Sequence, residues 1–390
     1  MKTKILNLAI IIILTGLSAS CNGYGEPAPG AYMLDQYKSI IQGKNVAVVA
    51  NQTSMVGEIH LVDKLLLEGI KIKVIFSPEH GFRNMADAGE SVADGRDPET
   101  GIALLSLYGS HKKPAPEDLD EIDIVIFDIQ DVGVRFYTYI STLQYVMEAC
   151  AENSVKCLIL DRPNPNGFYV DGNILDTAFK SFVGLNPIPI VHGMTVGEYA
   201  TMLNGEKWLK NGEKCDLTVI KCRNYDHETY YDLPVKPSPN LPNQTAIYLY
   251  PSICFFEGTN VSLGRGTSLP FQVYGSPDLP DLGFSFTPES VPGAKNPPLL
   301  GIKCYGKDLS NAIEVGIVPR PEINLDLIID AYTSFRDKEK FFTDYFDVLA
   351  GGPLLREQIQ KGMSAREIRA TWRMGLEKFG VIRDKYLLYR

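Results

Sequence analysis

The sequence lacks the signatures of several common protein classes. Its 390 residues carry a net charge of −9, and no basic run extends beyond Lys112-Lys113, which argues against a nucleic-acid-binding surface. No Walker sequence occurs and no G-x-G-x-x-G follows the first predicted strand, so we expect no nucleotide cofactor. A G-x-S-x-G sequence is also missing, which disfavours a serine hydrolase.

Histidine is too scattered, and cysteine too irregularly spaced, to predict a metal centre. The five histidines, at positions 60, 80, 111, 192 and 227, do not have the spacing of metal ligands, and no two cysteines form a C-x-x-C pair. An exported protein would permit disulfides, but several cysteines lie in apolar segments. We interpret them as small buried hydrophobes, and we predict neither a metal nor any other cofactor.

The first residues resemble a bacterial export signal. Two lysines precede an apolar stretch, Ile5–Leu17, that is short for a membrane span, and small residues then lead to Cys21. We predict a lipoprotein signal over 1–20 and lipidation of Cys21, with a plain secretory signal as the alternative. Either signal would place the protein in the periplasm or at a bacterial membrane. The Gly- and Pro-rich residues that follow predict a tether over 21–37.

Strands and helices alternate over the first half of the chain. Runs such as Asn45–Ala50 and Lys71–Phe76 are typical of buried strands, and helical periodicity separates several of them. The alternation predicts an α/β fold with a Rossmann-like, mostly parallel sheet and helices on both faces. Dense prolines near residue 240 predict a domain boundary. We therefore expect a catalytic domain over 38–240 and a smaller C-terminal α/β domain over 241–390.

Some element boundaries can be predicted from local signals. Thr195 with Glu198, and Ser364 with Glu367, form the pattern of a capping box, which predicts that a helix begins at each pair. The second of these helices carries one apolar stripe, which we interpret as a core contact. Ile188–Val191 is predicted to be a short strand.

Polar clusters follow five of the predicted strands. Because ligands of such sheets bind beyond the carboxyl ends of the strands, we expect these clusters to share one concave site, although ordinary turns could supply some of them. The clusters are Asn51–Thr53, Glu79–Arg83, Asp128–Arg135, Asp161–Asn166 and His192. A later Gly-rich segment carries Glu257, Asn260 and Arg265, and it predicts either a second wall of the same cleft or an ordinary hairpin.

Several motifs, in order, resemble one known family. The motifs are SPEHGFR, DIQDVGVRFYTY, DRPNPNG, HGMTVGEYA, FFEGTNVSLGRGT and the terminal KYLLY. The chain is similar to the exo-acting β-N-acetylmuramidases of peptidoglycan recycling, formerly a bacterial domain of unknown function. The resemblance implies release of N-acetylmuramic acid from the non-reducing ends of peptidoglycan fragments, in a cleft between two domains. The expected partners are muramyl saccharides, with membrane contact only through a lipid anchor.

Glycoside hydrolysis requires a proton donor and usually a second carboxylate. The resemblance places the catalytic acid on Glu79, and the adjacent His80 belongs to the same expected catalytic cluster. For the second carboxylate, Asp128 is our first choice, because it is the last acid of a central strand. Asp131 and Glu257 are the other choices.

The acetamido group of the substrate could replace that second carboxylate. Tyr137 or Asn164 would then orient it. The lactyl carboxylate of muramic acid calls for a fixed cation. The arginines that could supply it are Arg83, Arg135, Arg162 and Arg265. The other expected lining residues are Asn51, Asp131, His192, Glu257 and Asn260.

Other functions remain open at this stage. The chain could be a glycan-binding lipoprotein without turnover, or a paralogous hydrolase that acts on another amino sugar. An esterase or amidase that acts on cell-wall material is a further alternative.

Overall fold

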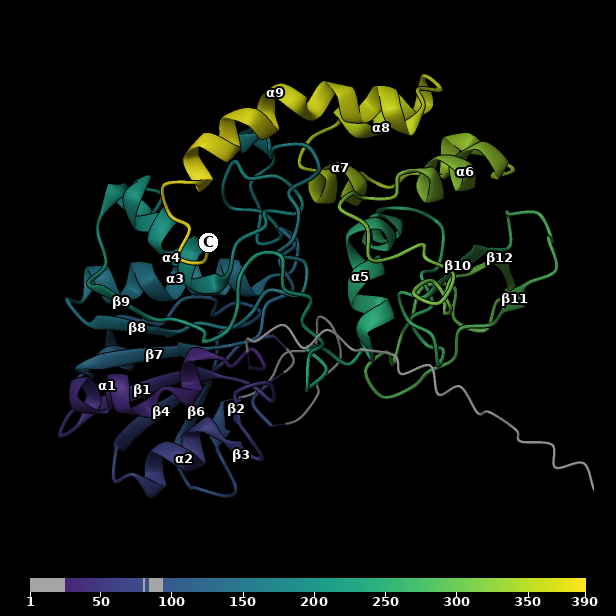
Figure 1. Ribbon diagram of the computed structural model, residues 1–390. Coiled ribbons are helices and arrows are strands. Elements are labelled where there is room, and N and C mark those ends of the chain that lie inside the picture. Colours follow the sequence, from purple (N-terminus) through teal and green to yellow (C-terminus); the bar gives the residue numbers. More distant parts are fainter. Residues whose placement is uncertain (1–24, 80, 84–93) are drawn as a thin grey trace, which may run out of the picture.

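The computed structural model describes residues 25–79, 81–83 and 94–390 (Figure 1). The predicted export signal, Cys21 and His80 lie outside these residues. Within the described ranges, no helix combines the length and the apolar character that crossing a membrane requires.

A seven-stranded sheet forms the first half of the chain, in the order β5-β6-β4-β1-β7-β8-β9. All neighbouring strands pair in parallel except β5, which runs antiparallel at the edge. The chain moves outward from β1 to β4 and β6 and then returns to β7 on the other side of β1. The strand order therefore reverses beside β1, where ligands of doubly wound sheets bind. The strands are β1 Asn45–Ala50, β4 Lys71–Ser77, β5 Gly95–Arg96, β6 Ala103–Ser106, β7 Ile124–Asp128, β8 Lys156–Leu160 and β9 Leu217–Ile220, and a separate hairpin joins β2 Met55–Val56 to β3 Ile59–His60.

Helices cover both faces of this sheet, because successive strand residues point to opposite sides. Val46 and Val48 of β1 pack in one core with α1 and α2, whereas Ala47 and Val49 pack in the other with α3 and α4. Figure 1 shows the two layers on either side of the strands. The α/β fold class is confirmed. The helices are α1 Leu34–Ile41, α2 Leu61–Leu67, α3 Tyr139–Glu152 and α4 Val196–Gly205, with short 3-10 turns at Gly30–Tyr32, Pro116–Leu119, Thr177–Phe179 and Lys210–Gly212.

The second half of the chain builds a smaller α/β unit beside the sheet (Figure 1). Its three strands pair antiparallel in the order β10-β12-β11. Helix α9 begins at the predicted capping box, and Ile368, Trp372 and Phe379 of its apolar stripe are buried, which confirms that interpretation. The elements are α5 Gln244–Ile253, β10 Val273–Ser276, β11 Ser285–Phe286, β12 Cys304–Asp308, α6 Asp326–Ser334, α7 Asp344–Ala350, α8 Leu354–Gln360 and α9 Ala365–Arg383, with 3-10 turns at Cys254–Gly258 and Lys338–Lys340.

Two local predictions need correction. Residues 28–37, expected in a tether, belong to the fold: the backbones of Ala28 and Arg223 pair, and a Cβ added at Gly30 would lie 2.2 Å from the Ile220 carbonyl oxygen. Glycine is needed there for close packing rather than for flexibility. Ile188–Val191 forms no strand, because Val191 makes only isolated bridges to loop residues.

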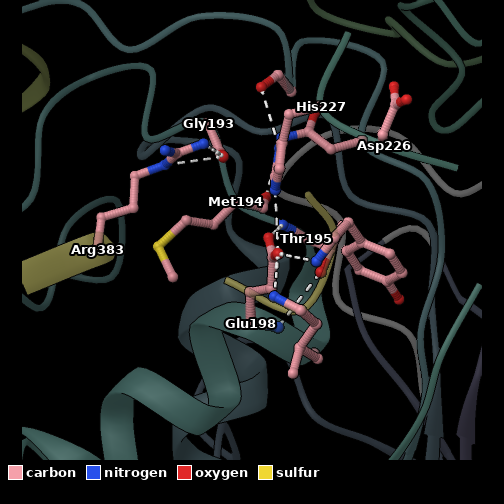
Figure 2. A network of polar contacts seen from close by, with 12 residues as sticks. Gly193, Met194, Thr195, Glu198, Asp226, His227 and Arg383 are labelled. Atoms are coloured by element: carbon pink, nitrogen blue, oxygen red, sulfur yellow. Dashed lines mark hydrogen bonds and ion pairs between the residues drawn. The ribbon is translucent and has the colours of Figure 1, made fainter. Parts of the chain in front are cut away.

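The end of the chain returns to the first domain and is held by Glu198 of α4, which is fully buried. This carboxylate accepts from the Thr195 amide at 2.9 Å and lies 3.0 Å from His227 Nε2; Figure 2 shows both contacts. It also accepts from the Leu388 amide at 2.7 Å. Nearby, Arg383 at the end of α9 donates to the Gly193 carbonyl (Figure 2). These contacts fix the C-terminal segment against the first domain.

The hydroxyl of Tyr389 is the last anchor of this segment. It donates to Asp161 Oδ2 at 2.6 Å and accepts from the Cys222 amide at 2.8 Å. We expect Tyr389→Phe to lower the free energy of unfolding by about 1–3 kcal/mol, because buried polar partners lose their hydrogen bonds. Urea unfolding would measure the loss. As a control, Tyr230→Phe alters a tyrosine that is 60% exposed and should change little; equal effects of the two substitutions would contradict the expectation.

Candidate active site

A cavity of about 480 Å³ lies between the two halves of the chain. Loops after β4, β6 and β7 supply one wall, beside the place where the strand order reverses. Segments after α5, together with α7, supply the other wall. The polar and aromatic lining residues are Glu79, Tyr108, Lys112, Phe136, Tyr137, Thr138, Tyr139, Ser181, Phe182, Ser238, Tyr250, Glu257, Arg265, Phe271 and Tyr345.

Glu79 is placed at this cavity by the end of β4, since Pro78 cannot continue the ladder. The Thr138 hydroxyl donates to Glu79 Oε2 at 3.0 Å, and the Tyr139 hydroxyl lies 3.4 Å from the Glu79 carbonyl oxygen. Burial, followed by the negative charge of Glu79, raises the pKa of Tyr108 above its usual range. The hydroxyl groups of Thr138 and Tyr108 thus lie beside the carboxyl group of Glu79.

Glu257 and Arg265 form a pair on the opposite wall. Arg265 Nη2 and Nε donate to Glu257 Oε1 at 2.6 and 3.1 Å, and the guanidinium carbon lies 4.9 Å from the centre of the Phe271 ring. Burial opposes the charge of Arg265, but the Glu257 carboxylate outweighs this and raises the pKa of Arg265. Burial and then Glu257 also raise the pKa of the Cys254 thiol, which disfavours a thiolate nucleophile.

Both carboxylates act on the same part of the cavity. The pKa of Tyr345 is raised first by burial and then by neighbouring negative charge that includes Glu257 and Glu79. All three residues line the same cavity. An acid and a second carboxylate over one cavity can perform hydrolysis of a glycosidic bond.

Asp128 does not line this cavity. Arg162 Nε and Nη2 donate to its two carboxylate oxygens at 2.6 and 2.9 Å, and both side chains are almost fully buried. The Ser54 hydroxyl donates to the Asp128 carbonyl. This ion pair lies at the end of β7 and joins it to the segment that follows β8.

The other expected arginines are also engaged elsewhere. Arg83 forms ion pairs with Asp63, Asp97 and Glu99 at 2.8–3.2 Å, beside a separate surface cavity. Arg135 is fully buried and donates only to backbone carbonyls, including that of Leu349, and burial lowers its pKa to about 9. Of the four arginines expected to bind a carboxylate, Arg265 is therefore the one on the cavity lining.

Three further predicted residues form a buried layer outside the lining. Asn51 Nδ2 donates to the Tyr139 hydroxyl at 3.0 Å, and so supports a lining residue from behind. Asn164 Nδ2 donates to the Met194 carbonyl at 2.9 Å. Burial lowers the pKa of His192 to about 3, which keeps the imidazole neutral.

The remaining two predicted residues differ from each other. Asn260 is exposed and donates to the Lys340 carbonyl at 2.6 Å. Asp131 is buried and accepts from the Gly133 amide at 2.6 Å, and burial raises its pKa to about 7. Neither residue lines the cavity.

The structure thus brings together Glu79, Tyr137, Glu257 and Arg265 from the predicted set. Sequence reasoning missed most of the tyrosines on the lining, as well as Lys112 and Phe182. Burial is the leading cause that raises the pKa of Tyr137, Tyr139 and Tyr250, so these phenols remain protonated. The only available signals were the high tyrosine content and the motif that contains Tyr137 and Tyr139.

A Rossmann-like domain, a smaller partner domain and two carboxylates on an aromatic-lined cavity fit the class of glycoside hydrolases. Family models of the N-terminal and C-terminal parts of exo-β-N-acetylmuramidase NamZ match residues 46–245 and 248–389. Over 382 residues, 92% of this chain and 90% of the relative, the chain is 38% identical to peptidoglycan β-N-acetylmuramidase NamZ of Bacillus subtilis. The chain belongs to the exo-β-N-acetylmuramidase NamZ family, which confirms the resemblance seen in the motifs.

Solved structures agree with this assignment. The crystal structure of a DUF1343 family protein from Bacteroides fragilis is 51% identical, with a TM-score of 0.86 over 94% of this chain and 99% of that chain. A second DUF1343 family protein from the same organism is 27% identical, with a TM-score of 0.76 over 93% and 99% of the two chains. The two-part architecture is therefore shared with proteins of known structure.

The raised pKa of Asp131 predicts a pH-dependent stability. Because the pKa rises from 3.8 to about 7 on folding, the folded protein keeps a proton that the unfolded chain releases between these values. The stabilising contribution is present below about pH 4 and is lost as the pH rises through 7. We expect wild type to lose on the order of 2–4 kcal/mol more than Asp131→Asn over this interval. Urea unfolding at pH 4, 5.5, 7 and 8 tests this; parallel curves for the two proteins would contradict it.

Proposed function

We propose that the chain hydrolyses the glycosidic bond of a terminal N-acetylmuramic acid at the non-reducing ends of peptidoglycan fragments. The observation that carries this proposal is the placement of Glu79 and Glu257 on one cavity of about 480 Å³. Tyrosine and phenylalanine rings on the same lining offer flat apolar faces, and the protonated phenols offer hydrogen bonds, which suits a sugar ring. The matching relative is named for muramidase activity on peptidoglycan, which supports the same chemistry here.

Glu79 is the general acid in this proposal. Its proton passes to the glycosidic oxygen as the bond to the anomeric carbon breaks, and water supplies the hydroxyl group of the released sugar. The Thr138 hydroxyl, which donates to Oε2, fixes the orientation of the carboxyl group. Orientation matters because proton transfer requires hydrogen-bond reach between the acid and the leaving oxygen.

Glu257 is the second carboxylate, in place of Asp128. Its Oε1 accepts from Arg265, which fixes the side chain at the cavity wall opposite Glu79. A negative group there stabilises the positive charge that develops on the sugar in the transition state. If the substrate acetamido group attacks instead, Tyr137 is the better placed of the two predicted orienting residues, since it lines the cavity and Asn164 does not.

Removal of the proton donor should abolish most turnover. We expect Glu79→Gln to lower kcat by about 10²- to 10⁴-fold on a MurNAc–GlcNAc disaccharide, the usual contribution of general acid–base catalysis. Release of free N-acetylmuramic acid by the soluble chain from residue 22 onward is the measurement, with a thermal melt to show that the variant folds. Equal release by both proteins would reject the role of Glu79. No release by a folded wild type would instead favour a binding protein or another substrate.

Matched amide substitutions distinguish the two choices for the second carboxylate. We expect Glu257→Gln to lower kcat by about 100-fold or more, and to cost less stability than Asp128→Asn because the Glu257–Arg265 pair is partly exposed. Asp128→Asn should behave in the opposite way: it breaks a buried ion pair, so about 3–5 kcal/mol of stability is lost, while kcat of the folded fraction stays within about tenfold. Kinetics combined with urea unfolding decide between them. If only Asp128→Asn loses activity, Asp128 is the second carboxylate, as first expected from the sequence.

A further inference from the structure

Two cations line the cavity among the residues that the structure describes, Lys112 and Arg265. The charge of Arg265 is compensated by Glu257, 2.6 Å away. Lys112 differs: within the described ranges, no carboxylate lies at ion-pair distance from its ammonium group. Its Nζ instead lies 4.9 Å from the centre of the Phe182 ring. An aromatic face attracts a cation without neutralising its charge, so Lys112 keeps its capacity to bind an anion.

The Phe182 ring is held in place on more than one side. Ser181 and Gly184 exchange backbone hydrogen bonds of 3.0 and 2.9 Å, which makes a tight turn with Phe182 at its tip. The ring stacks on Tyr145 of α3, with centroids 6.0 Å apart and planes 13° apart. Tyr108 lies on another side of it at 6.5 Å. The ammonium group above this ring is therefore positioned by a fixed platform.

The platform belongs to the same wall as the proposed general acid. Tyr108 contacts Phe182 and also lies near the Glu79 carboxylate, whose charge raises the pKa of the phenol after burial. Tyr108 thus connects the Lys112–Phe182 pair to the place where the glycosidic bond would be cleaved. Glu79, Tyr108, Lys112 and Phe182 all line the same cavity.

We propose that Lys112, positioned by Phe182, binds the lactyl carboxylate that distinguishes N-acetylmuramic acid from N-acetylglucosamine. The inference rests on the proposed function, and it transfers the role first expected of an arginine to a lysine. Arg265 is the poorer choice, because a substrate carboxylate beside it would also face the negative charge of Glu257. Lys112 presents a positive charge on the lining without that competitor.

The neighbouring residue Lys113 provides a matched control. Its ammonium lies 2.6 Å from Glu152 and 3.7 Å from Glu148, and it does not line the cavity. Lys112→Met and Lys113→Met remove the same charge from adjacent positions of one loop. A general effect of net charge or loop stability would appear in both variants, whereas recognition of the substrate would appear only in the first.

The test compares N-acetylmuramic acid with its methyl amide, in which the lactyl carboxylate is neutral. Dissociation constants are measured by calorimetry for wild type and each variant. We expect Lys112→Met to raise the dissociation constant of the acid by about 10- to 100-fold, which is the contribution of one hydrogen bond to a charged group. The dissociation constant of the amide should change by no more than about twofold. Lys112→Arg should keep most of the preference for the acid over the amide. Lys113→Met should have the same ratio of the two dissociation constants as wild type. In turnover, Lys112→Met should raise KM far more than it lowers kcat.

If the ratio of the dissociation constants of acid and amide is the same in Lys112→Met as in wild type, the inference is wrong. It is also wrong if wild type binds the two ligands equally. A muramyl peptide carries its carboxylate farther out, on the peptide. Loss of binding confined to that ligand would also overturn the lactyl assignment. The binding readout needs no turnover. A chain that hydrolyses nothing but prefers the acid through Lys112 would therefore reject the proposed function alone, and an active chain indifferent to Lys112 would reject this inference alone.

Discussion

The buried guanidinium of Arg135 connects the two walls of the cavity. Its Nη1 donates to the carbonyls of Asn173 and Ile188, and its Nη2 donates to those of Leu349 and Ala350 at the end of α7. Next to it in the chain, Phe136 and Tyr137 line one wall, and Leu349 lines the other. Because a buried charge is costly unless it is satisfied, these carbonyl dipoles must stay in place, and the position of α7 is tied to the loop after β7.

The sequence predicted the scaffold better than the site, and the reasons are physical. Buried strands need apolar side chains on both faces, so β1 and β7 appear as nearly continuous apolar runs, and β4 as an apolar run after Lys73. Capping boxes mark the starts of α4 and α9 because few other residue pairs satisfy a free helix N-terminus. Gly30 misled the prediction of a tether, since glycine serves close packing as readily as flexibility.

Polar residues after a strand did not by themselves indicate a functional site, because buried loops also need polar side chains for structural reasons. A loop folded beneath a sheet edge must satisfy its backbone amides and carbonyls. Asn164 and Asn166 donate to the carbonyls of Met194 and Val132, so their sequence resembles a site while their contacts are structural. Glu79 and Asp128 each stand at a strand end, and only the tertiary structure shows that one faces a cavity and the other an arginine. No sequence pattern pointed to Lys112, because its proposed role depends on the Phe182 ring, which lies 70 positions away in the chain.

The two cavity carboxylates have different neighbours. Glu257 Oε1 accepts two hydrogen bonds from the guanidinium of Arg265. The carboxyl of Glu79 contacts the Thr138 hydroxyl, and its charge raises the pKa of the Tyr108 phenol, which therefore remains a neutral donor. Glycoside hydrolysis needs one carboxyl group that gives up a proton and one that stays charged. In the proposed mechanism, Glu257 beside Arg265 is the charged group and Glu79 is the acid. Both residues are glutamates, so the difference between their neighbours is visible only in the tertiary structure.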